Sequence, residues 1–122
     1  MTAKILVVDD EPHIVRLVSF KLKKAGFDVL TAVNGQQALE LTLSEQPALI
    51  LLDVMLPDAD GYAVCYQLKE QLGPQAPKIV LLSARSREID ILKGYESGAD
   101  SYITKPFDPQ NLLTSVEQIL EE

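Results

Sequence analysis

The chain has one cysteine, one histidine and no long run of apolar residues. Cys65 cannot form an internal disulfide, which is consistent with a reducing compartment such as the cytoplasm. His13 has no second histidine to help it hold zinc. The apolar runs span roughly half a dozen residues, far short of the ~20 of a membrane-spanning helix. No charged segment leads into an apolar stretch at the start, so we expect neither a signal peptide nor a membrane partner.

Basic residues are also few. Eleven Lys and Arg face 18 Asp and Glu, which gives a net charge of −7. This balance argues against direct nucleic-acid binding, because phosphate backbones attract cationic surfaces. The 122 residues, 47% of them hydrophobic, are enough for one packed core. We therefore expect a single domain over residues 1–122.

Short apolar runs alternate with stretches of helical length. The runs are rich in Val, Ile and Leu and mostly lack polar–apolar alternation, which is typical of strands buried on both faces. They are Lys4–Val8, Asp28–Ala32, Ala48–Leu52, Lys78–Leu82 and Ser101–Thr104. Five such strand–helix alternations predict an α/β fold with a parallel sheet and helices on both of its faces.

Residues typical of helix starts support this division. Pro12 suits the first turn of a helix, and Asp108-Pro109 combines a good N-cap with a first-turn proline. Asn34-Gly35 is typical of hairpins. Because helix-like sequence follows it, we expect a strand-to-helix turn there instead.

Polar side chains gather at the carboxyl ends of the predicted strands, where open parallel sheets bind ligands. Asp9 and Asp10 follow the first strand, Asp53 ends the third, Ser83 follows the fourth and Lys105 the fifth. Each has an ordinary alternative role: the aspartates and the serine as helix caps or turn residues, and the lysine as a solvated side chain. Their common position at one edge favours a functional site.

These residue types suit phosphoryl chemistry. Two carboxylates ~4 Å apart repel by about 4 kcal/mol at an effective dielectric constant of 20. A hard divalent cation offsets this repulsion, and Mg²⁺ is the usual choice where phosphate is bound. A carboxylate such as Asp53 can act as a nucleophile and form an aspartyl phosphate. Mg²⁺ and Lys105 would stabilise the transferred group, and Ser83 could donate a hydrogen bond to it.

The residues of this edge resemble those of the receiver domain of bacterial two-component response regulators. The resemblance covers nearly the whole chain and implies a doubly wound, flavodoxin-like three-layer (βα)5 fold with five parallel strands in the order 2-1-3-4-5. It rests on these stretches: Ile5-Leu6-Val7-Val8-Asp9-Asp10-Glu11, Leu51-Leu52-Asp53-Val54-Met55-Leu56-Pro57 with Gly61, Leu82-Ser83-Ala84, Gly98-Ala99-Asp100 and Lys105-Pro106-Phe107.

The resemblance implies a role for each residue of the edge. Asp53 would accept a phosphoryl group from the phosphohistidine of a sensor kinase or a phosphotransfer protein. Asp10, Asp53 and the backbone carbonyl of Met55 would bind Mg²⁺, with Asp9 acting partly through a metal-bound water. Lys105 would bind a phosphoryl oxygen. Such a domain catalyses only its own phosphorylation and dephosphorylation.

The resemblance also implies a conformational switch. The Ser83 hydroxyl would move toward the phosphoryl group, and the Tyr102 ring would turn inward behind it. The face formed by the fourth helix, fifth strand and fifth helix would then change its binding of a downstream protein or output domain. Lys105-Pro106 would be a cis peptide.

Two positions beside the phospho-acceptor set family members apart. They are occupied here by Met55 and Arg85, each two residues after a site residue. A polar side chain at the first position can orient an attacking water, whereas methionine cannot donate that hydrogen bond. We therefore hypothesise slow self-dephosphorylation.

The first helix carries more apolar residues than one stripe needs. Ile14 and Leu17 form a second row beside the acidic pair. One interpretation is a wide buried face. The other, which the resemblance implies, is a kinase-docking patch that includes Pro106 and Phe107.

Two other functions share some of these features. A Mg²⁺-dependent phosphatase with an aspartyl-phosphate intermediate usually has a second aspartate where Met55 stands. An unphosphorylated pseudo-receiver would lack part of the set that this chain keeps. We expect no output domain within residues 1–122. Receivers of winged-helix transcription factors resemble Arg87–Lys105, but their dimers usually use a basic residue of the last helix, and residues 110–122 contain none.

Overall fold

Five strands and five α-helices alternate along the chain in a computed structural model that describes residues 2–121. The strands are β1 (Lys4–Val8), β2 (Asp28–Ala32), β3 (Leu49–Asp53), β4 (Lys78–Ser83) and β5 (Ser101–Thr104). The helices are α1 (Pro12–Lys24), α2 (Gly35–Glu45), α3 (Gly61–Leu72), α4 (Glu88–Glu96) and α5 (Pro109–Leu120), and a short 3₁₀ turn, η1 (Gly73–Gln75), follows α3. Within residues 2–121, none of the helices has the length and apolar character needed to cross a membrane.

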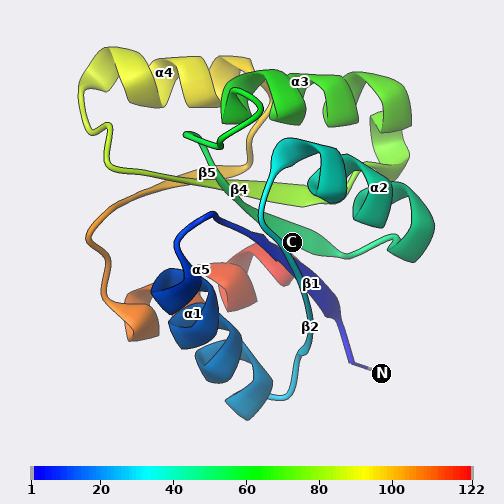
Figure 1. Cartoon of the computed structure of the whole chain (residues 1–122), viewed down its shortest axis with the longest axis vertical. Helices are drawn as coiled ribbons and strands as arrows, with labels where there is room; N and C mark the ends of the chain where they lie inside the picture. The colour runs from blue at the N-terminus through cyan, green and yellow to red at the C-terminus, as the bar shows by residue number, and fades with distance from the viewer. Residues whose placement is uncertain (1, 122) are drawn as a thin grey trace.

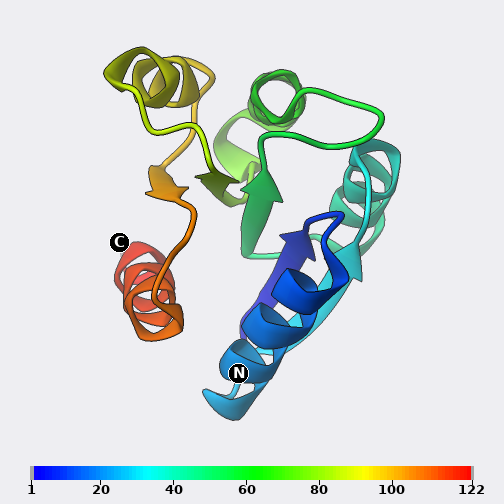
Figure 2. The same ribbon diagram turned by 60° about the vertical axis from the view of Figure 1, so that its left-hand side comes forward.

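All five strands belong to one parallel sheet with the order β2-β1-β3-β4-β5. This is the order that the resemblance implies. Helices cover both faces of the sheet: α2, α3 and α4 lie on one side and α1 and α5 on the other (Figure 1). The strand arrowheads point toward the same end of the sheet, so the loops after β1, β3, β4 and β5 share one edge (Figure 2). The predicted α/β fold is confirmed.

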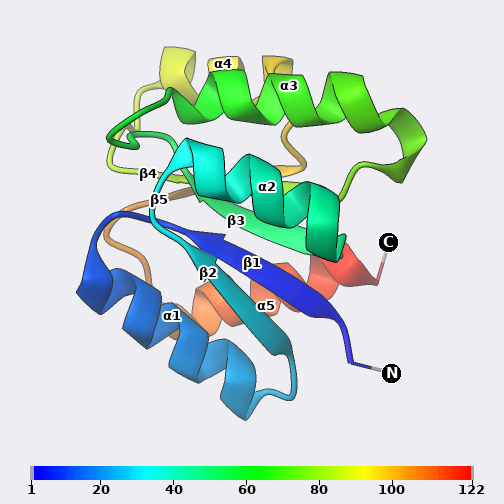
Figure 3. The same cartoon turned by 45° about the vertical axis from the view of Figure 1, so that its right-hand side comes forward.

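Figure 3 shows the two layers of helices on the two sides of the sheet. They pack on alternate residues of the same strands. The core beneath α2 and α3 takes Leu6, Ile50, Leu52 and Leu81 from the sheet. The core beneath α1 and α5 takes the intervening residues, which include Ile5, Val7, Leu49, Leu51, Val80 and Leu82. Because neighbouring residues of a strand point to opposite faces, both must be apolar, which explains the lack of alternation in the sequence.

Two strand ends differ from the sequence prediction. The third strand begins and ends one residue later than predicted, and the fourth extends by one residue to Ser83. Asp53 pairs with Leu82 in the sheet, and Ser83 pairs with Thr104. The strand ladder therefore includes both polar residues, and their backbones are fixed by the sheet.

The predicted helix starts are confirmed at α2 and α5. The Asn34 side chain accepts a hydrogen bond from the Gln37 N–H at 2.8 Å. Asp108 accepts one from the Gln110 N–H at 2.7 Å. Asn34-Gly35 is therefore a strand-to-helix turn. Such caps satisfy backbone donors that the first helical turn leaves unpaired.

The loop after β3 is tied to its surroundings at two points. The Asp58 carboxylate accepts hydrogen bonds from the backbone N–H groups of Gly35 and Gln36, at 2.7 and 3.0 Å, and so caps α2 from another loop. These bonds lower the pKa of Asp58, the Gly35 bond most of all. Gly61 lies against the end of β3, where a Cβ atom would be 2.5 Å from the Asp53 carbonyl oxygen. The loop therefore returns tightly over the strand that ends in Asp53.

Candidate functional site

The five polar residues predicted to share one edge of the sheet do so. Asp53 and Ser83 are the last residues of β3 and β4. Asp9 directly follows β1, and Lys105 directly follows β5. Asp9, Asp53 and Ser83 are almost completely buried, with exposed fractions of 0%, 4% and 0%. The fold thus encloses two carboxylates and a hydroxyl at the carboxyl ends of its strands.

Three carboxylates form a tight cluster. One oxygen from each of Asp9, Asp10 and Asp53 lies within 4.8 Å of the others. Asp9 and Asp53 are buried, whereas Asp10 is exposed to solvent. Carboxylate oxygens are the donors that hard divalent cations such as Mg²⁺ prefer. The chemistry and spacing of this set therefore fit a divalent metal ion.

Lys105 bridges the acidic cluster. Its Nζ atom lies 2.8 Å from Asp9 Oδ2, 3.4 Å from Asp53 Oδ2 and 3.4 Å from Glu11 Oε1. Glu11 was not among the predicted site residues. Three carboxylates thus lie within 3.4 Å of one ammonium group, and Asp10 adds a fourth carboxylate to the cluster, so negative charge remains in excess.

The helix-cap roles considered for Asp9 and Ser83 and the solvated role considered for Lys105 are wrong. The N-cap residue of α1 is Glu11, and no side chain caps that helix. Asp9 instead accepts a hydrogen bond from the Glu11 N–H at 3.0 Å, which holds its carboxylate toward the cluster. The N-cap of α4 is Arg87, not Ser83. Lys105 is largely buried rather than solvated.

The electrostatic environment shifts two pKa values. Burial, followed by the neighbouring charge of Asp9, raises the pKa of Asp53 from 3.8 to about 6. The Met55 N–H and Lys105 oppose this rise only in part. Burial opposes the charge on Lys105, but its hydrogen bond to Asp9 and the nearby carboxylates raise its pKa overall. Lys105 therefore stays charged at neutral pH, and Asp53 is ionised at an energetic cost.

Hydrogen bonds connect Ser83 to Tyr102 through the loop between β4 and α4. Ser83 Oγ accepts one from the Arg85 N–H at 3.0 Å, and the Tyr102 hydroxyl donates one to the Arg85 carbonyl at 2.9 Å. The Tyr102 hydroxyl also lies 3.2 Å from that of Tyr62 on α3. The Tyr102 ring packs against Gly94 of α4, where a Cβ atom would lie 2.6 Å from the ring.

Met55 and Arg85 lie beside the cluster. The Met55 N–H donates a hydrogen bond to Asp53 Oδ1 at 3.2 Å, and its side chain is 55% exposed. The Arg85 side chain is also exposed. The Lys105-Pro106 peptide is cis, as the resemblance implies.

The four residues of the suggested docking patch differ in their environments. Ile14 and Phe107 are partly buried against the core beneath α1 and α5. Leu17 is 45% exposed, and Pro106 is exposed. The second apolar row of α1 is therefore part core and part surface.

Sequence reasoning missed Tyr62, Asp58 and Gly94. Tyr62 occupies an apolar position of α3, and its partner Tyr102 is 40 residues away in sequence. Asp58 lies in a loop where aspartate is common. An acidic residue in a short loop before a helix, such as Asp58, is only a weak sequence signal of a functional role. Tyr62 and Gly94 give no such signal, because their roles depend on contacts that the fold creates.

The raised pKa of Asp53 predicts a pH-dependent stability. Because the folded-state pKa of about 6 exceeds the ordinary 3.8, ionised Asp53 costs the folded state on the order of 3 kcal/mol above pH ~6 and nothing below pH ~4. Asp53→Asn should raise the free energy of unfolding at pH 8, and the gain should vanish as the pH falls toward 4. Denaturant unfolding without divalent cations measures this.

Asp28→Asn is the control, because Asp28 is an exposed carboxylate at the start of β2. It should change stability little at either pH. An Asp53→Asn variant no more stable than the wild type at pH 8 would contradict the explanation.

Known proteins resemble this chain in sequence. The sequence profile of the response regulator receiver domain matches residues 5–117. The alkaline phosphatase synthesis transcriptional regulatory protein PhoP of Bacillus subtilis is 48% identical in an alignment 122 positions long, which covers 98% of this chain and 49% of PhoP. The chain thus spans about half the length of this curated relative.

Solved structures of response regulators and their receiver domains are similar to this chain in sequence and fold. The BeF3-activated receiver domain of DrrB is 41% identical, with full coverage of both chains and a TM-score of 0.90. The response regulator DrrB, a Thermotoga maritima OmpR/PhoB homologue, is 42% identical over 99% of this chain and 54% of its own, with a TM-score of 0.89. The BeF3-activated N-terminal receiver domain of Klebsiella pneumoniae RstA is 34% identical, covers 98% and 99% of the two chains, and has a TM-score of 0.89.

The match over residues 5–117, the strand order and the acidic edge agree, and the chain belongs to the response regulator receiver domains of two-component signalling systems.

Proposed function

We propose that this receiver accepts a phosphoryl group on Asp53 from a sensor histidine kinase or a phosphotransfer protein, in the presence of Mg²⁺. One observation carries the proposal: Asp53 is a buried carboxylate with two further aspartates within 4.8 Å and an ammonium group at 3.4 Å. Such a setting suits the binding of both a cation and a phosphoryl group. With a partner of this class, the domain would act in the cytoplasm, which is part of this proposal.

In the transfer, a carboxylate oxygen of Asp53 attacks the phosphorus of a phosphohistidine. The P–O bond forms as the P–N bond breaks, and the electron pair returns to the imidazole nitrogen. Lys105 and the Ser83 hydroxyl would hold phosphoryl oxygens, and the Met55 N–H fixes one oxygen of Asp53 at 3.2 Å. The domain would catalyse only this transfer and its reversal by water.

A divalent metal ion would be held by Asp10, Asp53 and the Met55 carbonyl, with Asp9 acting through a water. When bound, Mg²⁺ would neutralise carboxylate repulsion and stabilise charge on the phosphoryl oxygens. The fit rests on the excess of carboxylates over Lys105 at this edge.

Acetyl phosphate and Mg²⁺ should add one phosphoryl group to the wild type, seen by intact-mass measurement. Asp53→Asn should add none, because it lacks the nucleophile, and Asp28→Asn should behave as the wild type. Chelation of Mg²⁺ should suppress the adduct. A wild type that gains no phosphoryl group would instead favour a pseudo-receiver, and steady turnover of small phosphate esters would favour a phosphatase.

Met55 supports slow loss of the phosphoryl group. Its side chain is 55% exposed beside Asp53 and has no donor to orient a water. Arg85, which is exposed on the loop between β4 and α4, is the second position that would tune the rate of dephosphorylation.

Met55→Asn should shorten the lifetime of the phosphorylated form severalfold, measured as decay after removal of the donor. Met55→Leu keeps an apolar side chain and should leave the lifetime near that of the wild type. An unchanged or longer lifetime for Met55→Asn would rule out this role.

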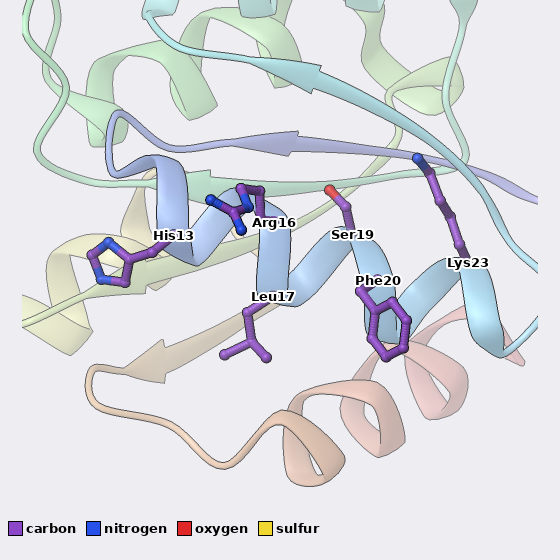
Figure 4. A pocket seen from close by; sticks show the side chains of 6 residues that line it. All are labelled: His13, Arg16, Leu17, Ser19, Phe20 and Lys23. Atoms are coloured by element: carbon purple, nitrogen blue, oxygen red, sulfur yellow. The ribbon is translucent and has the colours of Figure 1, made fainter.

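The exposed part of the apolar row on α1 supports kinase docking there. Leu17 and Phe20 are 45% and 65% exposed and project from the same side of the helix (Figure 4). They line a shallow hollow together with His13, Arg16, Ser19 and Lys23. An exposed apolar pair with a polar rim is typical of a protein-docking surface. We place Ile14 and Phe107 behind this surface, because both pack partly against the core.

Leu17→Asp should slow phosphotransfer from the cognate kinase by ~10-fold or more, as loss of an interface anchor does. It should spare phosphorylation by acetyl phosphate, because Leu17 lies outside the acidic edge. Leu43→Asp, at a leucine of α2 that is 55% exposed, is the matched control and should affect neither reaction. Equal loss in both reactions for Leu17→Asp would indicate misfolding and contradict a docking role.

The α4–β5–α5 face would carry the signal to a downstream protein or an output domain. On α4, Ile89, Leu92 and Tyr95 are each about half exposed, at 54%, 52% and 49%. Helix α5 has no Lys or Arg between Pro109 and Leu120. A dimer that pairs basic residues of α5 with acids of a second copy is therefore not supported by this face.

A further inference from the structure

A second tyrosine contacts the aromatic residue of the expected switch. Tyr62 lies near the start of α3 and is 7% exposed. Its hydroxyl lies 3.2 Å from the hydroxyl of Tyr102 and 3.1 Å from the carbonyl oxygen of Asp90 in α4. Burial and the contact with Tyr102 raise the pKa of Tyr62, so this hydroxyl keeps its proton at neutral pH. It is thus available as a donor.

Two hydroxyl protons serve three close contacts. Tyr62 can donate to Tyr102 or to the Asp90 carbonyl, and Tyr102 can donate to Tyr62 or to the Arg85 carbonyl. The Asp90 carbonyl lies inside α4, where the N–H four residues later is its regular partner. More than one arrangement uses both protons, and in two of them the contact between the two tyrosines is itself a hydrogen bond: Tyr62 donates to Tyr102, which donates to Arg85, or Tyr102 donates to Tyr62, which donates to Asp90. In the first, a continuous chain runs from Tyr62 through Tyr102 to Arg85. Hydrogen bonds in such a chain strengthen one another.

The chain of hydrogen bonds continues to the phosphoryl site. The Arg85 N–H donates to Ser83 Oγ at 3.0 Å, and this uses a lone pair of the serine but not its proton. Ser83 is thereby held in place with its O–H free to donate. Tyr62 of α3 is thus linked to Ser83 of β4 through Tyr102 and one residue of the loop.

We propose that Tyr62 is a positioning residue of the switch. Its hydroxyl holds the Tyr102 ring in the partly buried position beside Gly94, and Tyr102 in turn fixes Arg85 and the Ser83 hydroxyl. The inference rests on the proposed function for its effect on phosphorylation, but not for its effect on Tyr102. Without the Tyr62 hydroxyl, Tyr102 leaves this position more often, and Ser83 is less well placed to donate.

Nitration by tetranitromethane, mapped by mass spectrometry, tests the first half of this inference without any phosphoryl donor. Tyr62→Phe keeps the ring and removes the hydroxyl. It should raise nitration of Tyr102, relative to the half-exposed Tyr95 in the same molecule, by about fivefold, the effect of one lost hydrogen bond. Tyr66→Phe is the matched control on the same helix, because the Tyr66 hydroxyl bonds only locally, to Glu70. An unchanged Tyr102-to-Tyr95 ratio in Tyr62→Phe would overturn the proposal.

Initial rates of phosphorylation by acetyl phosphate test the second half. Tyr62→Phe should slow the reaction severalfold in the wild-type background and have no further effect in a Tyr102→Phe background. An equal loss in both backgrounds would mean that Tyr62 does not act through Tyr102 and would overturn the positioning role. A wild type that accepts no phosphoryl group would refute the proposed function alone, because the nitration ratio still decides the contact between the two tyrosines.

Discussion

The burial of like charges at one edge of the sheet is the constraint on which the site depends. Asp9 and Asp53 are almost inaccessible to water and share a single lysine at 2.8 and 3.4 Å. Removing carboxylates from water is costly unless a partner compensates. Lys105 offsets part of this cost, and the raised pKa of Asp53 reflects the part that is not offset. The excess of negative charge at this edge of the sheet therefore favours the binding of a cation.

The sheet makes this arrangement possible. Its parallel strands end together, and the apolar residues on both faces hold the strand ends in register. The helices cover both faces but leave this edge to loops. Loop residues such as Met55 and Arg85 supply backbone N–H groups to the strand-end side chains. The sheet thus positions the reactive side chains, and the short loops that follow the strands hold them through backbone hydrogen bonds.

The strands and most of the acidic edge were predictable from the sequence, and the remaining features were not, each for its own physical reason. The strands were predictable because burial on both faces requires unbroken apolar runs, as in Leu49–Leu52. The meeting of Asp9, Asp53 and Lys105 followed from parallel strand geometry. The last residue of β3 was not predicted, because a polar side chain ends an apolar run whether or not its backbone stays in the ladder. The contact between Tyr62 and Tyr102 was not predictable, since it joins α3 to β5 through side chains alone.

Gly94 limits which pairs of residues can occupy positions 94 and 102. The absence of a side chain at this position of α4 is what leaves room for the ring of Tyr102, since a Cβ atom would lie 2.6 Å from it. Residues 94 and 102 are therefore not free to diverge separately. A lineage that acquires a larger residue at 94 must also accept a smaller side chain at 102 or a ring turned away from the helix, and with it different contacts to Tyr62 and Arg85.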